Sequence, residues 1–199
     1  MNFMLISLEE LYWSTRYLNK ETGWDLGSIS TPLKQYLDQI LNFQLSILVP
    51  GAGNGHEASY AFQIGFENLH ILDISPVPLG EFLLANPDFP KSQCHHENFF
   101  AHDGQYDLIL EQTFFCALPP EMRSQYAAKM HALLKPGGKL VGVLFNRDFQ
   151  LQGPPFGGSE SEYLGYFQGL FHVLKMEACK NSIPARQGSE FFFVLQKPQ

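Results

Sequence analysis

The stretch Leu48-Val49-Pro50-Gly51-Ala52-Gly53-Asn54-Gly55-His56-Glu57 lies between a short apolar run, residues 45–49, and a helix-like run, residues 58–66. Its three glycines at alternate positions let the backbone turn sharply and let a ligand approach closely, because glycine has no Cβ. The helix that follows points its unpaired N–H groups at whatever occupies the turn. This stretch therefore predicts a strand, a ligand-binding turn and a helix, the opening unit of an α/β sheet.

Asp73 ends a second apolar run, about twenty residues after the glycine turn. A carboxylate at that distance can accept hydrogen bonds from both hydroxyls of a ribose, although it can also cap a loop. The glycine spacing is G-x-G-x-G after a proline, whereas dinucleotide sites favour G-x-G-x-x-G, with a third glycine under a pyrophosphate. The combination predicts a nucleoside-containing cofactor, and the spacing favours S-adenosylmethionine, which carries no phosphate.

The bulk composition predicts one globular domain over residues 1–199, since 45% of the residues are hydrophobic and 17% are charged. A formal net charge of -7 without a basic stripe argues against nucleic acid and membrane surfaces as partners. Cys94, Cys116 and Cys179 are far apart and form no C-x-x-C motif, which favours a reducing cytoplasm. We expect a monomer that acts on a small-molecule substrate.

Apolar periodicity and breaker residues divide the chain into alternating helices and strands. Helices are predicted over residues 7–18, with a capping box at Ser7 and Glu10, and over 31–41, 58–66, 78–84, 120–134 and 161–171. Strands are predicted over residues 45–49, 69–74, 93–100, 106–112, 140–145, 172–179 and 191–196. The Pro136-Gly137-Gly138 turn is expected to stop the fifth helix.

This order predicts an α/β fold, a doubly wound, mostly parallel seven-stranded sheet with an antiparallel C-terminal edge hairpin. Ligands of such sheets bind outside the carboxyl ends of the strands. Predicted strand ends carry Gly51, Asp73, Asn98 to Phe100, Gln112 and Phe145. We therefore expect these residues to surround one pocket.

Several segments resemble class I S-adenosylmethionine-dependent methyltransferases, and more narrowly the thiopurine methyltransferase superfamily with its plant halide/thiol methyltransferases. The resemblance covers nearly the whole chain. Its segments are Trp13-Ser14-Thr15-Arg16-Tyr17, Thr22-Gly23-Trp24-Asp25-Leu26-Gly27, residues 106–123 with Phe114-Phe115-Cys116-Ala117-Leu118, Leu134-Lys135-Pro136-Gly137-Gly138, and Gly153-Pro154-Pro155-Phe156. The resemblance implies a Rossmann-like fold and methyl transfer from S-adenosylmethionine, with S-adenosylhomocysteine as the product.

The resemblance also implies roles for individual residues. The cofactor-binding set that it implies is Trp13, Tyr17, Trp24, Gly51, Gly53, Asp73, Asn98, Phe99 and Gln112, with the N-terminal segment 1–42 covering the cofactor. For the methyl acceptor we expect Phe114, Phe145 and Arg186. The chain departs from the family at Asn98, where an acid is common, at Gln112, where Tyr or Arg is usual, and at Phe145, where plant members carry a tyrosine.

The remaining candidate catalytic residues include no convincing acid–base pair. We therefore expect a site that aligns its substrates rather than one that transfers a proton. We expect two or three of the strand-end phenylalanines to lie in the pocket, where aromatic faces can hold a sulfonium cation, and the others to pack in the core. His95 and His96 point to opposite faces of a strand, so no metal is expected. Cys116 has no base beside it in the sequence and is expected to be a buried apolar residue. Arg123 is either solvated or paired with a carboxylate.

The leading hypothesis is transfer of the methyl group to a small soft nucleophile, such as a thiol, hydrosulfide, halide or thiopurine-like acceptor. Methylation of another small molecule at oxygen or nitrogen is the alternative within enzymes. A cofactor-binding module without turnover and a nucleotide oxidoreductase are the alternatives from other classes. The chain lacks an N-P-P-Y type motif, which argues against methylation of a flipped base.

Overall fold

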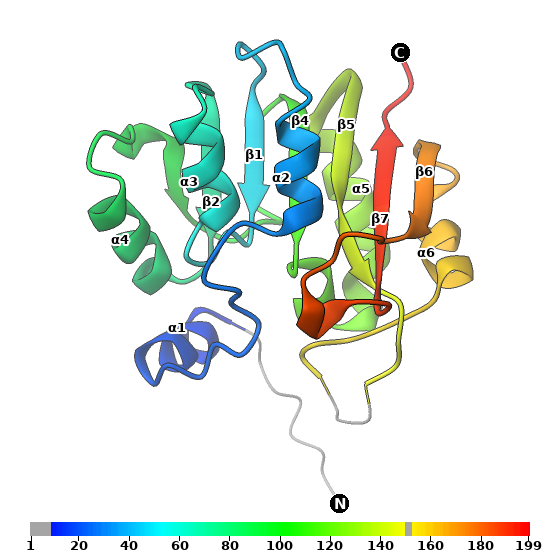
Figure 1. Ribbon diagram of the computed structural model, residues 1–199, viewed down its shortest axis with the longest axis horizontal. Coiled ribbons are helices and arrows are strands. Elements are labelled where there is room, and N and C mark those ends of the chain that lie inside the picture. The colour runs from blue at the N-terminus through cyan, green and yellow to red at the C-terminus, as the bar shows by residue number, and fades with distance from the viewer. Residues whose placement is uncertain (1–8, 150–152) are drawn as a thin grey trace, which may run out of the picture.

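The computed structural model describes residues 9–149 and 153–199 and contains a seven-stranded sheet in the order β3-β2-β1-β4-β5-β7-β6 (Figure 1). The strands are β1 (Ile47–Pro50), β2 (Leu69–Asp73), β3 (Cys94–His96), β4 (Tyr106–Gln112), β5 (Leu134–Phe145), β6 (His172–Ala178) and β7 (Glu190–Gln196). The first five strands pair in parallel, whereas β7 runs antiparallel to both β5 and β6. The predicted doubly wound sheet with an antiparallel C-terminal hairpin is confirmed.

Helices cover both faces of the sheet. They are α1 (Glu10–Leu18), α2 (Thr31–Leu37), α3 (His56–Gln63), α4 (Pro76–Ala85), α5 (Arg123–Leu133) and α6 (Glu160–Phe167), and the 3-10 turns are η1 (Lys91–Gln93), η2 (Phe115–Ala117), η3 (Pro120–Met122) and η4 (Pro184–Arg186). No helix within the described ranges is long and apolar enough to cross a membrane.

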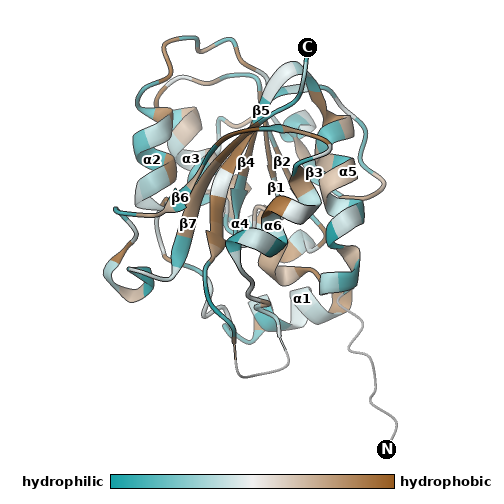
Figure 2. Cartoon of the chain, turned by 90° about the vertical axis from the view of Figure 1, so that its right-hand side faces the viewer, coloured by the Kyte–Doolittle hydropathy of each residue, from teal (hydrophilic) through white to brown (hydrophobic). Residues whose placement is uncertain are grey.

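The core lies on the two faces of the central strands, because their continuous apolar runs bury side chains in both directions. Ile47 and Val49 pack with α2, α3 and α4 on one face, whereas Leu48 packs with α5 and α6 on the other. Figure 2 shows the strands in apolar colours along much of their length. The predicted buried parallel strands are confirmed, and their carboxyl ends point toward α1 in Figure 1.

Two predicted helices near the N-terminus are shorter in the structure. The helix expected over residues 7–18 begins at Glu10, and the capping residue Ser7 lies outside the described residues. The helix expected over 31–41 ends at Leu37, because the amides of Gln39 and Ile40 bond to carbonyls three residues back and tighten the chain into a turn. Leu41, expected on the buried face, is 89% exposed.

The Pro136-Gly137-Gly138 segment does not separate helix from strand as predicted. Strand β5 begins at Leu134, opposite Tyr106, and its pairing with β4 resumes at Lys139 after a register shift. Gly137 has φ +76° and its amide bonds to the carbonyl of Lys197. The segment therefore forms a bulge that the C-terminal chain covers.

One strand and one helix end earlier than predicted, because a local turn stops each of them. The strand expected over residues 93–100 ends at His96, and the Asn98 side chain then accepts a hydrogen bond from the Phe100 amide, which folds the chain into a turn. The helix expected over 161–171 ends at Phe167, whose carbonyl accepts hydrogen bonds from the next turn.

Candidate active site

The glycine turn after β1 has the left-handed backbone that its sequence predicts. Gly51, Gly53 and Gly55 have φ values of +57°, +53° and +68°. A Cβ on Gly51 would overlap the ring of Phe114, and a Cβ on Gly53 would lie 2.6 Å from the hydroxyl oxygen of Tyr17. Glycine is thus required at these positions both by the backbone and by the aromatic side chains that pack over it.

Asp73 lies at the end of β2 with its side chain facing the glycine turn. Its two carboxylate oxygens accept hydrogen bonds from the amides of Gly53 and Ser75, each at 2.8 Å. Burial raises the pKa of Asp73, while the two amides act in the opposite direction. The amides fix the carboxylate's orientation and leave each oxygen a further lone pair for a ligand hydroxyl.

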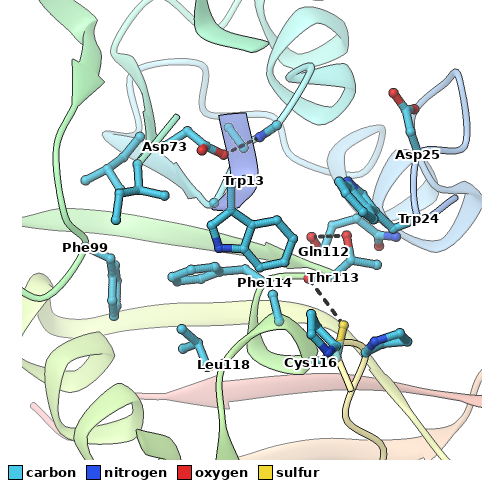
Figure 3. Close-up of a pocket in the computed structure, with 18 of the residues that line it drawn as sticks. Trp13, Trp24, Asp25, Asp73, Phe99, Gln112, Thr113, Phe114, Cys116 and Leu118 are labelled. Atoms are coloured by element: carbon cyan, nitrogen blue, oxygen red, sulfur yellow. Dashed lines mark hydrogen bonds between the residues drawn. The ribbon is translucent and has the colours of Figure 1, made fainter. Parts of the chain in front are cut away.

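A cavity of about 400 Å³ opens at these strand ends (Figure 3). Ten of the twelve residues expected at the site line it: Trp13, Tyr17, Trp24, Gly51, Gly53, Asp73, Asn98, Phe99, Gln112 and Phe114. Three phenylalanines, Phe99, Phe100 and Phe114, are among the lining residues, in line with the expected two or three. Its volume falls in the range of small-molecule sites, about 300–1,000 Å³.

An aromatic wall from α1 and the loop after it closes one side of the cavity. Trp24 stands edge-to-face against both Trp13 and Tyr17, with ring centroids 5.5 and 5.7 Å apart. The guanidinium carbon of Arg16 lies 5.2 Å from the centroid of the Trp24 ring. Burial and the nearby charge of Asp73 raise the pKa of Tyr17, which keeps its hydroxyl protonated. The wall therefore presents neutral aromatic surface to the cavity.

Asp25 fastens this wall to the glycine turn, a connection that the sequence does not reveal. Its carboxylate bonds to the His56 imidazole at 2.7 Å, to the Gly27 amide at 2.7 Å and to the side chain of Asn54. The hydrogen bond to His56 is the main cause that lowers the pKa of Asp25 to about 2, and the same bond raises the pKa of His56. We call the Asp25–His56 pair the latch.

The end of β4 contributes a buried polar atom and a supported loop. The side-chain oxygen Oε1 of Gln112 is buried without a hydrogen-bond partner among the described residues. The buried carboxylate of Glu111 accepts hydrogen bonds from the amides of Phe114 and Phe115 at 2.8 and 2.9 Å, and from the hydroxyl of Tyr126. Burial raises the pKa of Glu111 to about 7. Glu111 thus holds the Phe114 loop in place beneath the cavity.

The side of the cavity away from Asp73 is apolar (Figure 3). Its lining includes Cys116, Leu118, Met122, Pro154 and Pro155. The Cys116 thiol donates to the carbonyl of Thr113 at 3.2 Å, and burial raises its pKa to about 12. The thiol is therefore neutral, as the sequence interpretation of a buried apolar residue requires.

Phe145 and Arg186 do not line this cavity, so the expectation that Phe145 shares the common pocket is wrong. Strand β5 ends beside β7, and Phe145 faces a separate small cavity with Glu190. The Arg186 guanidinium bonds to Glu190 at 3.3 Å and to the Trp24 carbonyl at 2.7 Å, and its carbon lies 5.4 Å from the Phe145 ring centroid. These contacts brace the loop that carries Trp24.

Arg123 is buried at the start of α5, so it is not a solvated helix residue. It bonds to Glu162 of α6 at 2.5 Å and to the Gly157 carbonyl at 2.8 Å. Its carbon lies 4.8 Å from the ring centroid of Phe115. Arg123 therefore joins α5, α6 and the segment before α6 below the apolar side of the cavity.

Known proteins resemble the chain along almost all of its length. Residues 8–192 match the family model described as Thiopurine S-methyltransferase (TPMT). The chain is 30% identical over 203 residues to thiocyanate methyltransferase 1 of Arabidopsis thaliana, covering 94% of this chain and 85% of the relative. It is 26% identical to thiopurine S-methyltransferase of a Pseudomonas aeruginosa strain, covering 83% of this chain and 85% of the relative.

Solved structures show the same fold. The 1,6-didemethyltoxoflavin-N1-methyltransferase of Burkholderia thailandensis, solved with 1,6-didemethyltoxoflavin and S-adenosylhomocysteine, superposes with a TM-score of 0.79. It is 17% identical and the match covers 96% of this chain and 87% of that chain. With the family model matching nearly every described element, the chain belongs to the thiopurine S-methyltransferase family and is an S-adenosylmethionine-dependent methyltransferase.

Proposed function

We propose that the cavity holds S-adenosylmethionine between the strand ends and the aromatic wall. When bound, this cofactor supplies a methyl group on a sulfonium sulfur. The unpartnered Oε1 of Gln112 supports the assignment, because a buried acceptor atom needs a donor and an α-ammonium group supplies one. The fixed carboxylate of Asp73 suits the two ribose hydroxyls, because each oxygen keeps a further lone pair beside its amide partner.

The remaining lining residues divide between the two ends of such a ligand. Gly51 and Gly53 line the end of the cavity that takes the amino-acid part, and their left-handed backbone holds the turn against it. Asn98 and Phe99 flank the adenine, and Trp13, Tyr17 and Trp24 cover the ligand from the N-terminal segment. Of the proposed segment 1–42, α1 and the loop after it supply the cover, whereas Leu33 and Leu37 of α2 pack in the core.

For the acceptor, we propose a small soft nucleophile, of the thiolate, hydrosulfide, thiocyanate or halide class. The observation that carries this proposal is the apolar side of the cavity, from Cys116 and Leu118 to Pro155. The buried carboxylates of the lining are already engaged, Glu57 by the Ser30 amide and Asp73 by two amides, and the half-buried Asp25 is engaged by His56. No described residue of the apolar side offers a free general base.

Such a surface suits a nucleophile that is already ionised. Transfer of a methyl group from a sulfonium to an anion removes both charges, so a poorly solvating surface favours the transition state over the separated ions. Soft anions lose their hydration at less cost than oxyanions do. The protein then has to bind, align and exclude water, and it has no proton to remove. The relatives named for thiocyanate and thiopurine substrates support the same class.

The test is S-adenosylhomocysteine release with thiocyanate, hydrosulfide, iodide, an aromatic thiol, an alcohol and an amine. We expect product with the sulfur and halide acceptors and none with the alcohol or amine. At saturating cofactor, the thiocyanate rate should be flat with pH, because this anion is ionised throughout, whereas the thiol rate should follow the thiol's own ionisation. A thiocyanate rate that climbs steeply with pH would require an enzyme base and would contradict the proposal.

Two outcomes of the same panel favour the alternatives. Product with only the alcohol or the amine favours an oxygen or nitrogen acceptor. Binding of S-adenosylhomocysteine without product from any acceptor favours a module that binds the cofactor and does not turn over. Loss of cofactor binding in Asp73→Ala, with Glu81→Ala on the exposed side of α4 as the matched control, separates failed binding from failed chemistry.

We further propose that the enzyme acts as a monomer in a reducing cytoplasm. All three cysteines are free thiols, which supports the reducing compartment. Sedimentation equilibrium tests the first point, since a dimer that exchanges lining residues would give twice the mass.

A further inference from the structure

A second cluster of chemistry-bearing side chains lies at the β3 edge of the sheet, apart from the cavity lining. His95 comes from β3, Glu97 follows two residues later on the same face, and His102 is returned to it by the turn at Asn98. His102 is buried, and Glu97 is 38% exposed. The cluster therefore has a fixed inner side and an opening to solvent.

The three side chains present their ligand atoms to one point. The Glu97 Oε1 atom lies 2.7 Å from Nδ1 of His102 and 3.8 Å from Nδ1 of His95. One ligand atom of each residue lies within 4.8 Å of the others. Around a tetrahedral zinc ion with bonds of about 2.0–2.2 Å, ligand atoms are roughly 3.3 Å apart, so small side-chain rotations suffice.

The far nitrogen of each imidazole also has a protein partner. Nε2 of His95 bonds to Nδ1 of His70 at 2.9 Å, and Nε2 of His102 bonds to the hydroxyl of Tyr106 at 2.7 Å. Metal-binding histidines are oriented in this way by a second group that holds the nitrogen away from the ion. The Tyr106 hydroxyl can donate or accept, so it serves either tautomer of His102.

We propose that His95, Glu97 and His102 bind a zinc-class divalent ion, with a fourth position open to water. Two imidazoles and one carboxylate suit zinc, whereas magnesium and calcium take oxygen ligands. His96 is not part of the site: its imidazole turns to the carbonyl of Ile74 at 3.1 Å. The sequence interpretation places His95 and His96 on opposite faces, and the site comes from Glu97 and His102 instead. This proposal is independent of the acceptor.

The test uses the untagged full-length protein, titrated with Zn²⁺ by calorimetry and with Co²⁺ by visible absorption. We expect one equivalent of either ion, with the strong visible bands of four-coordinate Co²⁺, and no response to Mg²⁺. Glu97→Gln and His95→Gln should each weaken binding by about tenfold or more, and Tyr106→Phe by about 10–100-fold. His96→Gln is the matched control and should bind as the parent chain does.

Thermal unfolding of each variant without metal separates loss of the site from loss of the fold. Metal binding that is unchanged in Glu97→Gln, or that is lost equally in His96→Gln, would show that the ion binds to scattered surface histidines. Either result would overturn the proposal. Absence of binding in the parent chain would overturn it as well.

Discussion

Replacement of Asp25 by Asn tests whether the latch holds the aromatic wall over the cofactor. The Asp25 carboxylate is the point where the Trp24 loop meets His56 at the start of α3. Asn keeps the size of the side chain and the capacity to accept one hydrogen bond, but it loses the charge. The variant should therefore leave the fold intact and loosen the wall, and S-adenosylhomocysteine should bind more weakly.

The size of the effect follows from the pKa of Asp25. A fall from 3.8 to about 2 means that its partners stabilise the carboxylate by roughly 2 kcal/mol, since one pKa unit is about 1.4 kcal/mol. The side chains of His56 and Asp25 are 30% and 17% exposed, so solvent screens part of this. After this screening, about 1 kcal/mol of the stabilisation remains to hold the aromatic wall closed over the cofactor. Its loss in Asp25→Asn corresponds to a roughly fivefold rise in the dissociation constant of S-adenosylhomocysteine.

The pH dependence has a definite sign. The hydrogen bond to Asp25 raises the pKa of His56 above its ordinary value of 6.5. The latch therefore stabilises the closed wall fully below pH 6.5, and this stabilisation is lost as pH rises through the raised pKa of His56. The dissociation constant of S-adenosylhomocysteine should therefore increase as pH rises above about 6.5. This slope should disappear in Asp25→Asn and in His56→Gln.

Calorimetry measures the constants, and intrinsic fluorescence reports the wall directly, because both tryptophans of the chain, Trp13 and Trp24, belong to it. Glu21→Gln, an exposed carboxylate in the same loop, is the matched control. A dissociation constant for Asp25→Asn that stays within about twofold of the parent value near pH 6.5 would refute the reasoning. So would a parent constant that does not vary with pH.

Four further predictions follow from single contacts. Gly51→Ala should abolish cofactor binding in calorimetry, because its Cβ strains the left-handed backbone and overlaps Phe114; a variant that still binds would show that the turn adapts. Burial raises the pKa of Glu111 to about 7, so ionisation of this carboxyl lowers the stability of the fold as pH rises from about 4.5 through 7. The melting temperature of the parent chain should therefore fall over that range, and that of Glu111→Gln should stay nearly constant. An equal fall in the variant would show that another group causes the effect. Glu162→Ala should lower the free energy of unfolding by about 3 kcal/mol in urea melts, since it leaves the buried Arg123 cation with one carbonyl partner, and a loss under about 1 kcal/mol would contradict this. No Lys or Arg lines the cavity within the described residues, so the cofactor must supply the positive charge that holds an anion. Thiocyanate should therefore bind detectably to the enzyme complex with a cofactor analogue that carries an ammonium in place of the sulfonium, and not to the complex with neutral S-adenosylhomocysteine. Equal binding to both complexes would point to a cation outside the lining.

The fold was predictable where a strand is buried on both faces. The strands β1, β2 and β4 are built around short runs of branched apolar residues, and their observed bounds lie within about two residues of the predicted ones. The errors fall where a short-range turn competes with the apolar pattern. Asn98 stops β3 with its own side chain, and the glycines after Pro136 permit a bulge that a sequence pattern cannot distinguish from a helix stop.

The site was predictable to the extent that strand ends define it. Gly51, Asp73, Asn98 and Gln112 meet because parallel strands end at one edge of the sheet. The latch was not predictable, since Asp25 and His56 are 31 residues apart and lie in a loop and at a helix start. No periodicity connects such positions, so only the tertiary structure brings them together.

The cavity has two unlike sides, and this difference restricts its chemistry. The Asp73 carboxylate is held by two amides and the Asp25 carboxylate by His56, so both groups already have partners before an acceptor binds. On the Leu118 side the surface is apolar, and the Cys116 thiol is held protonated. Among the described residues of this apolar side, an acceptor that needs a proton removed meets no free base, whereas an ionised soft anion meets low solvation and the positive charge of the donor. The apolar side therefore selects acceptors by their own acidity, and the residues that form it exclude water rather than act as bases.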